Sequence, residues 1–188
     1  MSISPKQLVV LGDSGVYGWG DREGGGWCER LRKHWMNLPI APVLYPLGIR
    51  GNGLEDIAKR WSNEWLCRGE LKRKFPDGIL VSIGLNDSAN IGRQDGRPKL
   101  SAEAFRYGLM QLLGEMKTQT SVMVTGLTPV NEEFMPFAEC LWYSNKAGEI
   151  YEAQIEEVCL ERDIPFLPIH KEFLLQSNWI NLLENDGI

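Results

Sequence analysis

The sequence predicts an α/β protein: a three-layer α/β/α sandwich built around a mainly parallel, five-stranded sheet. Short apolar runs alternate with amphipathic helical patterns along the whole chain, as expected of a doubly wound sheet with right-handed crossovers. The runs end in glycine-rich or polar turns, which mark the ends of strands. The 188 residues, 43% of them hydrophobic, suit one core, so we expect a single domain over residues 1–188.

Five apolar runs are the expected strands. They cover residues 8–11, 42–49, 77–83, 121–127 and 165–169. Each run is short and bounded by turn residues, which is typical of a buried parallel strand. Pro46 interrupts the second run, and proline has no N–H for a sheet ladder. We therefore expect that strand at an edge of the sheet or with a bend.

Helical periodicity between the strands predicts the covering helices. The first is expected over residues 27–36, and its apolar face should pack on the sheet. That face consists of Trp27, Leu31, Trp35 and Leu38. Further helices are expected over residues 54–65, from the N-cap Ser101 onward, and around residues 151–160. Residues 131–143 hold large apolar side chains without a clean period, which predicts a loop folded onto the core; the alternative is a lid or wall of an apolar substrate pocket.

Charge and hydropathy exclude several classes of partner. The net charge is −5, and nucleic-acid binding would favour a basic patch instead. The mild basic cluster from Arg68 to Lys74 includes Glu70, so we expect a solvated face there. No apolar run approaches the length of a membrane span, and residues 1–5 leave no room for a signal peptide before the first strand. We expect a cytoplasmic protein.

No cofactor or metal is implied by the sequence. The four cysteines are widely spaced without a Cys-x-x-Cys pair, which predicts reduced thiols and no zinc or redox site. The glycine-rich loop does not match a dinucleotide-binding motif either, because Gly18-x-Gly20 is followed by Arg22 and Glu23 where a third glycine should stand.

Ser14 is the candidate nucleophile. The run Gly12-Asp13-Ser14 directly follows the first strand, and open α/β sheets bind ligands at the carboxyl ends of their strands. Taken alone, the tripeptide is equally a turn with a helix cap, because Asp and Ser both accept hydrogen bonds from free N–H groups. The functional interpretation therefore depends on the rest of the chain.

Other polar positions fall at the same sheet edge. Gly51 lies in a second glycine-rich turn after the second strand, and Asn86 and Asp87 follow the third. Because parallel strands share one carboxyl edge, these residues should meet Ser14 there. We expect Asp13 and Asp87 to brace loops by accepting backbone N–H bonds rather than to act as acids.

In this order and placement, the chain resembles the SGNH (GDSL-type) hydrolase family of esterases and lipases over almost its entire length. Gly12-Asp13-Ser14 is similar to the nucleophile block of that family, Gly51 to the glycine of its second block, and Gly84-Leu85-Asn86-Asp87 to its third. The resemblance implies a flavodoxin-like fold with Ser14 as nucleophile. It also implies an oxyanion hole made of the Ser14 N–H, the Gly51 N–H and the Asn86 side chain.

The fourth block of that family, Asp-x-x-His, is incomplete here. Asp186 resembles its aspartate, but the sequence given stops at Ile188, where the histidine should follow. We expect a truncation just before that catalytic histidine. His170 follows the fifth strand and is an alternative base, although a cap or core role is expected for it; His34, among basic residues of the first helix, should face solvent.

The resemblance implies a serine hydrolase that cleaves carboxylic ester bonds of a small-molecule substrate by a Ser-His-Asp mechanism. The acyl chain and the alcohol part stay open, between lipid, acetylated sugar and thioester. The alternative is a catalytically dead module of the same fold that binds acyl or acetylated-glycan ligands. Only the absent base supports that alternative.

Overall fold

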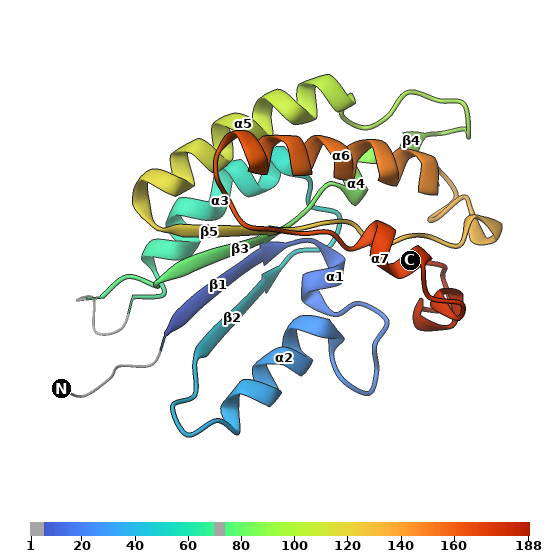
Figure 1. The fold of residues 1–188 in the computed structure, drawn as a ribbon. Coiled ribbons are helices and arrows are strands. Elements are labelled where there is room, and N and C mark those ends of the chain that lie inside the picture. Colours follow the sequence, from blue (N-terminus) through green and yellow to red (C-terminus); the bar gives the residue numbers. More distant parts are fainter. Residues whose placement is uncertain (1–5, 70–73) are drawn as a thin grey trace.

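The computed structural model describes residues 6–69 and 74–188 (Figure 1), so the first five residues and most of the basic cluster from Arg68 to Lys74 lie outside the described residues. Its main sheet has five strands in the order β2-β1-β3-β5-β7, and every pairing is parallel. The strands are β1 (Gln7–Gly12), β2 (Val43–Gly48), β3 (Gly78–Ser82), β5 (Ser121–Thr125) and β7 (Phe166–Leu167). The predicted sheet is confirmed, and β2, with Pro46, is an edge strand.

Helices cover both faces of the sheet, which confirms the three-layer sandwich. Helices α3 (Leu54–Leu66), α5 (Ala102–Gln119) and α6 (Asn145–Glu161) lie on one face, and α1 (Ser14–Tyr17) and α2 (Gly26–Met36) on the other (Figure 1). Within the described residues, no helix is long and apolar enough to cross a membrane.

Short elements gather where the strands end, on the right of Figure 1. They are α4 (Leu85–Ser88), α7 (His170–Leu174), the antiparallel pair β4 (Asn90–Ile91) and β6 (Leu141–Trp142), and the 3-10 turns Glu132–Phe134 and Trp179–Leu182. The carboxyl edge of the sheet is thus built from loops and single turns, which position side chains individually.

The main core lies between the sheet and α3, α5 and α6. Alternate strand residues point into it, such as Val9 and Leu11 of β1 and Val81 of β3, and all three are fully buried. Phe105 of α5 and Ile155 of α6 meet them from the helical layer. Most of the buried apolar side chains lie in this layer, and burying one such side chain contributes about 1.5–3 kcal/mol.

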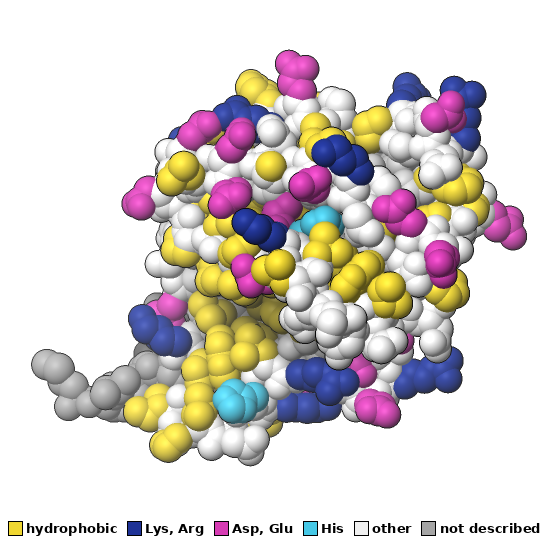
Figure 2. Space-filling model, turned by 45° about the vertical axis from the view of Figure 1, so that its right-hand side comes forward, with side chains coloured by type: hydrophobic (Ala, Val, Ile, Leu, Met, Phe, Trp, Pro, Cys, Tyr) yellow, Lys and Arg dark blue, Asp and Glu magenta, His cyan; other side chains and the backbone are white. Residues whose placement is uncertain are grey.

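The opposite face is covered only in part. A small cluster of Val10, Val16, Cys28 and Leu44 lies under α1 and α2, over strands β1 and β2. Across β5 and β7, Met123 is 38% exposed and Leu167 is 46% exposed. Figure 2 shows hydrophobic side chains gathered on the surface of this side of the molecule.

The expected apolar face of the first helix is partly wrong. Trp27 is exposed, and Leu38 is exposed beyond the end of the helix at Met36. Trp35 is half-buried and packs against the small cluster around Val10. Because α2 lies over the edge of the sheet, only a narrow stripe of it meets the strands, and Trp27 and Leu38 lie outside that contact.

Candidate active site

Ser14 stands at the tip of the turn that leaves β1. It is half-buried and opens α1, which is a single helical turn capped by Asp13: the Gly15 N–H donates to Asp13 Oδ1 at 3.0 Å. The backbone at the end of β2 packs closely against this turn. A Cβ at Gly48 would lie 2.1 Å from the Tyr17 nitrogen, so only glycine permits the approach. The turn is therefore held from two strands.

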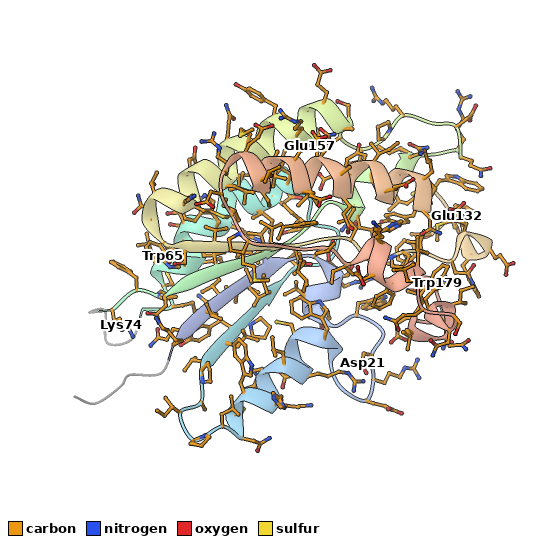
Figure 3. The ribbon with its side chains drawn as sticks, in the orientation of Figure 1. Asp21, Trp65, Lys74, Glu132, Glu157 and Trp179 are labelled. Atoms are coloured by element: carbon orange, nitrogen blue, oxygen red, sulfur yellow. The ribbon has the colours of Figure 1, made fainter. Side chains whose placement is uncertain are left out.

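Ser14 lines a cavity of about 760 Å³ at the carboxyl edge of the sheet. Its apolar lining includes Trp27, Leu85, Leu127, Phe173 and Leu183. Charged residues from the loop after α1 and from the chain end, such as Asp21 and Glu184, also line it. Figure 3 labels Asp21 in that loop and Trp179 in the C-terminal segment whose next residues complete the lining. The cavity joins the Ser14 hydroxyl to apolar walls, which is the general form of a small-molecule site.

Asn86 of α4 is buried and makes three hydrogen bonds. Its Nδ2 donates to Asp13 Oδ2 and to the Asn52 carbonyl, both at 3.1 Å, and its Oδ1 accepts from the Tyr143 hydroxyl at 2.9 Å. Asp13 and the Asn52 carbonyl can only accept, so they fix which side of the amide carries nitrogen. Both Nδ2 hydrogens therefore have protein partners. Asn86 does not itself line the cavity, but it donates to Asp13, which does.

Tyr143 is a site residue that sequence reasoning missed. It is buried, and burial raises the pKa of its phenol above the ordinary value, so the hydroxyl stays a donor. It ends residues 131–143, where Met135, Phe137 and Leu141 pack against the core around Tyr143 and Val130. These residues pack on the core and do not line the cavity, as expected of a loop folded onto the core rather than of a pocket wall.

Asp13 and Asp87 are buried carboxylates that accept backbone N–H bonds, as expected from the sequence. The Leu54 N–H at the start of α3 donates to both oxygens of Asp87, each at 3.1 Å. A Cβ at Gly53 would lie 2.4 Å from Asp87 Oδ1, so that approach also needs glycine. Burial raises the pKa of each carboxyl from 3.8 to about 6.

Asp87→Asn should flatten the pH dependence of stability between pH 5 and pH 8. A carboxyl whose folded pKa is raised stabilises the fold below its unfolded pKa, and this contribution is lost as the pH rises through about 6. Wild type should therefore gain about 1 to 1.5 kcal/mol more than the variant between pH 8 and pH 5. Urea unfolding at both pH values measures this. Asp13 and His170 are present in both proteins, and equal changes in the two would contradict the raised pKa.

Gly51 and Asn52 form the turn between β2 and α3. Gly51 has a φ of +76°, its carbonyl accepts from Lys99 Nζ at 3.0 Å, and the Asn52 N–H donates to the Ile49 carbonyl at 3.1 Å. Because the Asn52 carbonyl also accepts from Asn86, the turn is fastened to α4. Gly51 does not itself line the cavity.

Asp186 does not line the cavity but contacts Trp19, which does. Its Oδ2 accepts from the Trp19 indole N–H at 3.2 Å, and the Arg50 guanidinium lies 3.2 Å from the centre of the Trp19 ring. Trp19 and Ile188 both line the same cavity as Ser14. The end of the described chain and the candidate nucleophile therefore meet at one place.

Neither histidine lies in the cavity lining formed by the described residues. His170 is buried at the start of α7, its Nε2 is beside Gly148 of α6 without a hydrogen bond, and burial lowers its pKa. Its backbone N–H donates to Glu152 Oε2 at 3.0 Å. His34 is exposed on α2. The expected core role for His170 and solvent-facing role for His34 agree with these positions.

A family model for GDSL-like lipases and acylhydrolases matches residues 10–188. The chain belongs to this family. The match includes both Ser14 and Asp186, and it places the chain among hydrolases of acyl esters. No curated protein matches the chain.

Solved structures of the same fold agree with this membership. A lipase/acylhydrolase from Enterococcus faecalis is 19% identical, with a TM-score of 0.75 over 97% of this chain and 85% of that chain. The SGNH-hydrolase family esterase AlinE4 is 17% identical, with a TM-score of 0.70 over 100% of this chain and 87% of that one. A catalytic mutant of Axe2, an acetylxylan esterase from Geobacillus stearothermophilus, is 16% identical, with a TM-score of 0.63 over 88% and 77%.

Proposed function

We propose that this GDSL-family protein is a carboxylic ester hydrolase with Ser14 as its nucleophile. The observation that carries the proposal is the cavity at the sheet edge, which Ser14 and the chain end line together. Ser14 Oγ attacks the ester carbonyl and passes its proton to a base, and the tetrahedral intermediate then expels the alcohol, which takes that proton. Water repeats the sequence on the acyl-enzyme and releases the acid.

The proposed base is a histidine that follows Ile188 in the encoded protein, with Asp186 holding its imidazole in the correct tautomer. Two facts support this. Asp186 resembles the aspartate of the family pattern, and Ile188 lines the cavity that Ser14 lines. A residue attached directly to Ile188 starts at the edge of that cavity, whereas His170 is buried against α6.

The proposed oxyanion hole combines the N–H groups of Ser14 and Gly51 with the Asn86 amide. Fixed donors aimed at the developing negative charge each stabilise the transition state by about 3 kcal/mol. Asn86 has both hydrogens bonded to Asp13 and the Asn52 carbonyl, so it must turn one of them toward the substrate when an ester binds. The bond that remains, to Asp13 or to the Asn52 carbonyl, and the hydrogen bond from the Tyr143 hydroxyl then hold the rest of the amide in place.

Asn86→Ala should lower kcat by about 10²-fold or more while KM changes little, because the lost hydrogen bond strengthens only in the transition state. Steady-state kinetics on p-nitrophenyl butyrate measures both constants. Asn90→Ala is the matched control: its amide donates to the Gln94 carbonyl, outside the network of Asn86, and kcat should be unchanged. A kcat near wild type in Asn86→Ala would remove this residue from the proposed oxyanion hole.

The activity itself is tested with p-nitrophenyl esters of acetate, butyrate and octanoate, using the full-length encoded chain. The apolar lining, with Trp27, Leu127 and Phe173, supports an acyl chain as the group bound there. Turnover that depends on acyl length supports an esterase and defines its preference. Binding of the esters without turnover would instead favour the catalytically dead module.

A further inference from the structure

Arg60 of α3 turns its guanidinium inward, toward the carboxyl ends of two strands. The side chain is only 15% exposed. Its Nη2 donates to the Gly12 carbonyl at the end of β1 and to the Leu47 carbonyl near the end of β2, both at 2.9 Å. Its Nε donates to Asn52 Oδ1, also at 2.9 Å. One planar group therefore fastens three separate stretches of chain.

Two of these stretches carry groups of the proposed reaction. Gly12 lies two residues before Ser14, and Asn52 directly follows Gly51. The Asn52 carbonyl accepts from Asn86 Nδ2 at 3.1 Å, which extends the connection to the third oxyanion donor. Arg60 itself does not line the cavity, so it reaches the reaction only through these neighbours.

We propose that Arg60 is a positioning residue, which fixes the Gly51 turn and, through the Asn52 carbonyl, Asn86 relative to Ser14, so that only the Asn86 amide has to turn when the substrate binds. This inference rests on the proposed ester hydrolysis. Preorganised donors are effective because they need no rearrangement during the reaction, and a displacement of 1 Å can cost about 10²-fold in rate. The guanidinium suits the task, since its fixed fork serves several acceptors in one plane, whereas a lysine ammonium does not.

Arg60 also forms an ion pair with Glu64, and this pair offers a control that changes the charge near Arg60 without removing its inward hydrogen bonds. Its Nη1 lies 3.8 Å from Glu64 Oε1, and Glu64 also pairs with Arg68 at 3.0 Å. Glu64 is half-buried, and within the described residues its ion pairs are with Arg60 and Arg68, not with any of the three stretches. Removing the ion pair with Arg60 leaves the inward hydrogen bonds intact, so Glu64→Gln is a matched control for Arg60→Lys.

The test uses the full-length chain and p-nitrophenyl butyrate. Arg60→Lys should lower kcat by about tenfold or more with KM within about twofold, because the donors are misplaced and substrate binding is not. Glu64→Gln should keep the wild-type kcat. Phenylboronic acid, which forms a tetrahedral adduct on an active serine, should bind Arg60→Lys more weakly by a similar factor.

A merely structural Arg60 would behave differently. The melting temperature would fall, but kcat per active site, counted by titration with a fluorophosphonate, would be unchanged, and this result would overturn the proposal. If Arg60→Lys does not fold, Asn52→Ala removes the acceptor of Nε while leaving Arg60 in place, and kcat should again fall with KM little changed. An unchanged kcat in Asn52→Ala would equally overturn it.

The two proposals fail in distinguishable ways. If wild type hydrolyses no ester and fluorophosphonate does not label Ser14, the proposed function fails and the positioning role fails with it. If wild type is active, Ser14→Ala is not, and Arg60→Lys keeps the full kcat, only the positioning role is wrong.

Discussion

Ser14→Ala should abolish ester hydrolysis by the full-length chain, lowering kcat by about 10⁴-fold or more. The hydroxyl forms the acyl-enzyme, and alanine offers no other nucleophile at this turn. The residual rate should be that of the oxyanion donors acting on water. The variant should fold like wild type, because the cap of α1 comes from the Asp13 carboxylate and not from Ser14.

Fluorophosphonate labelling checks the same prediction without turnover. Wild type should take up one label, detected as a single mass increase, and Ser14→Ala none. Ser82→Ala is the matched control, since Ser82 is half-buried at the end of β3 and lines the same cavity, yet has no role in the proposed reaction. Labelling that survives in Ser14→Ala would show that another residue is the nucleophile.

A chain ending at Ile188 should fold but turn over esters at least about 10³-fold more slowly than the full-length chain, since an oxyanion hole without its base retains only weak catalysis. Folding is expected because the five strands and the helices of the main core all precede Trp179. Circular dichroism and p-nitrophenyl butyrate kinetics on the two lengths measure both parts. Alanine in place of the proposed histidine should reproduce the slow form.

Ordinary enzymatic rates from the chain that ends at Ile188 would contradict a base beyond that residue. His170→Ala would then be the variant to measure, with His34→Ala as its exposed control. Loss of activity in His170→Ala alone would mean that α7 moves to bring this histidine to Ser14. Retained activity in both variants would leave a base that is not a histidine.

The sequence by itself determined the parallel sheet and predicted that the polar residues following its strands lie at one edge. Apolar runs separated by helical periods specify parallel strands, and parallel strands place their carboxyl ends at one edge. For this reason Ser14, Gly51 and Asn86 could be predicted to lie at one edge, whereas their shared role in an oxyanion hole came from the family resemblance and stays a prediction. Pro46 on an edge strand followed equally from local chemistry, because a missing N–H is tolerated there.

Only the tertiary structure decided which side chains hold that edge together. Tyr143 and Asn86 are 57 residues apart, and their hydrogen bond depends on how residues 131–143 fold, for which no period gives a signal. Arg60 occupies a helical position where a solvated cation is the usual expectation, but the carbonyls of Gly12 and Leu47 turn it inward. Trp27 and Leu38 show the reverse: their spacing predicted burial, but both are exposed because α2 covers only the edge of the sheet. Periodicity encodes which residues favour burial, whereas the partner of each polar group depends on where distant segments pack.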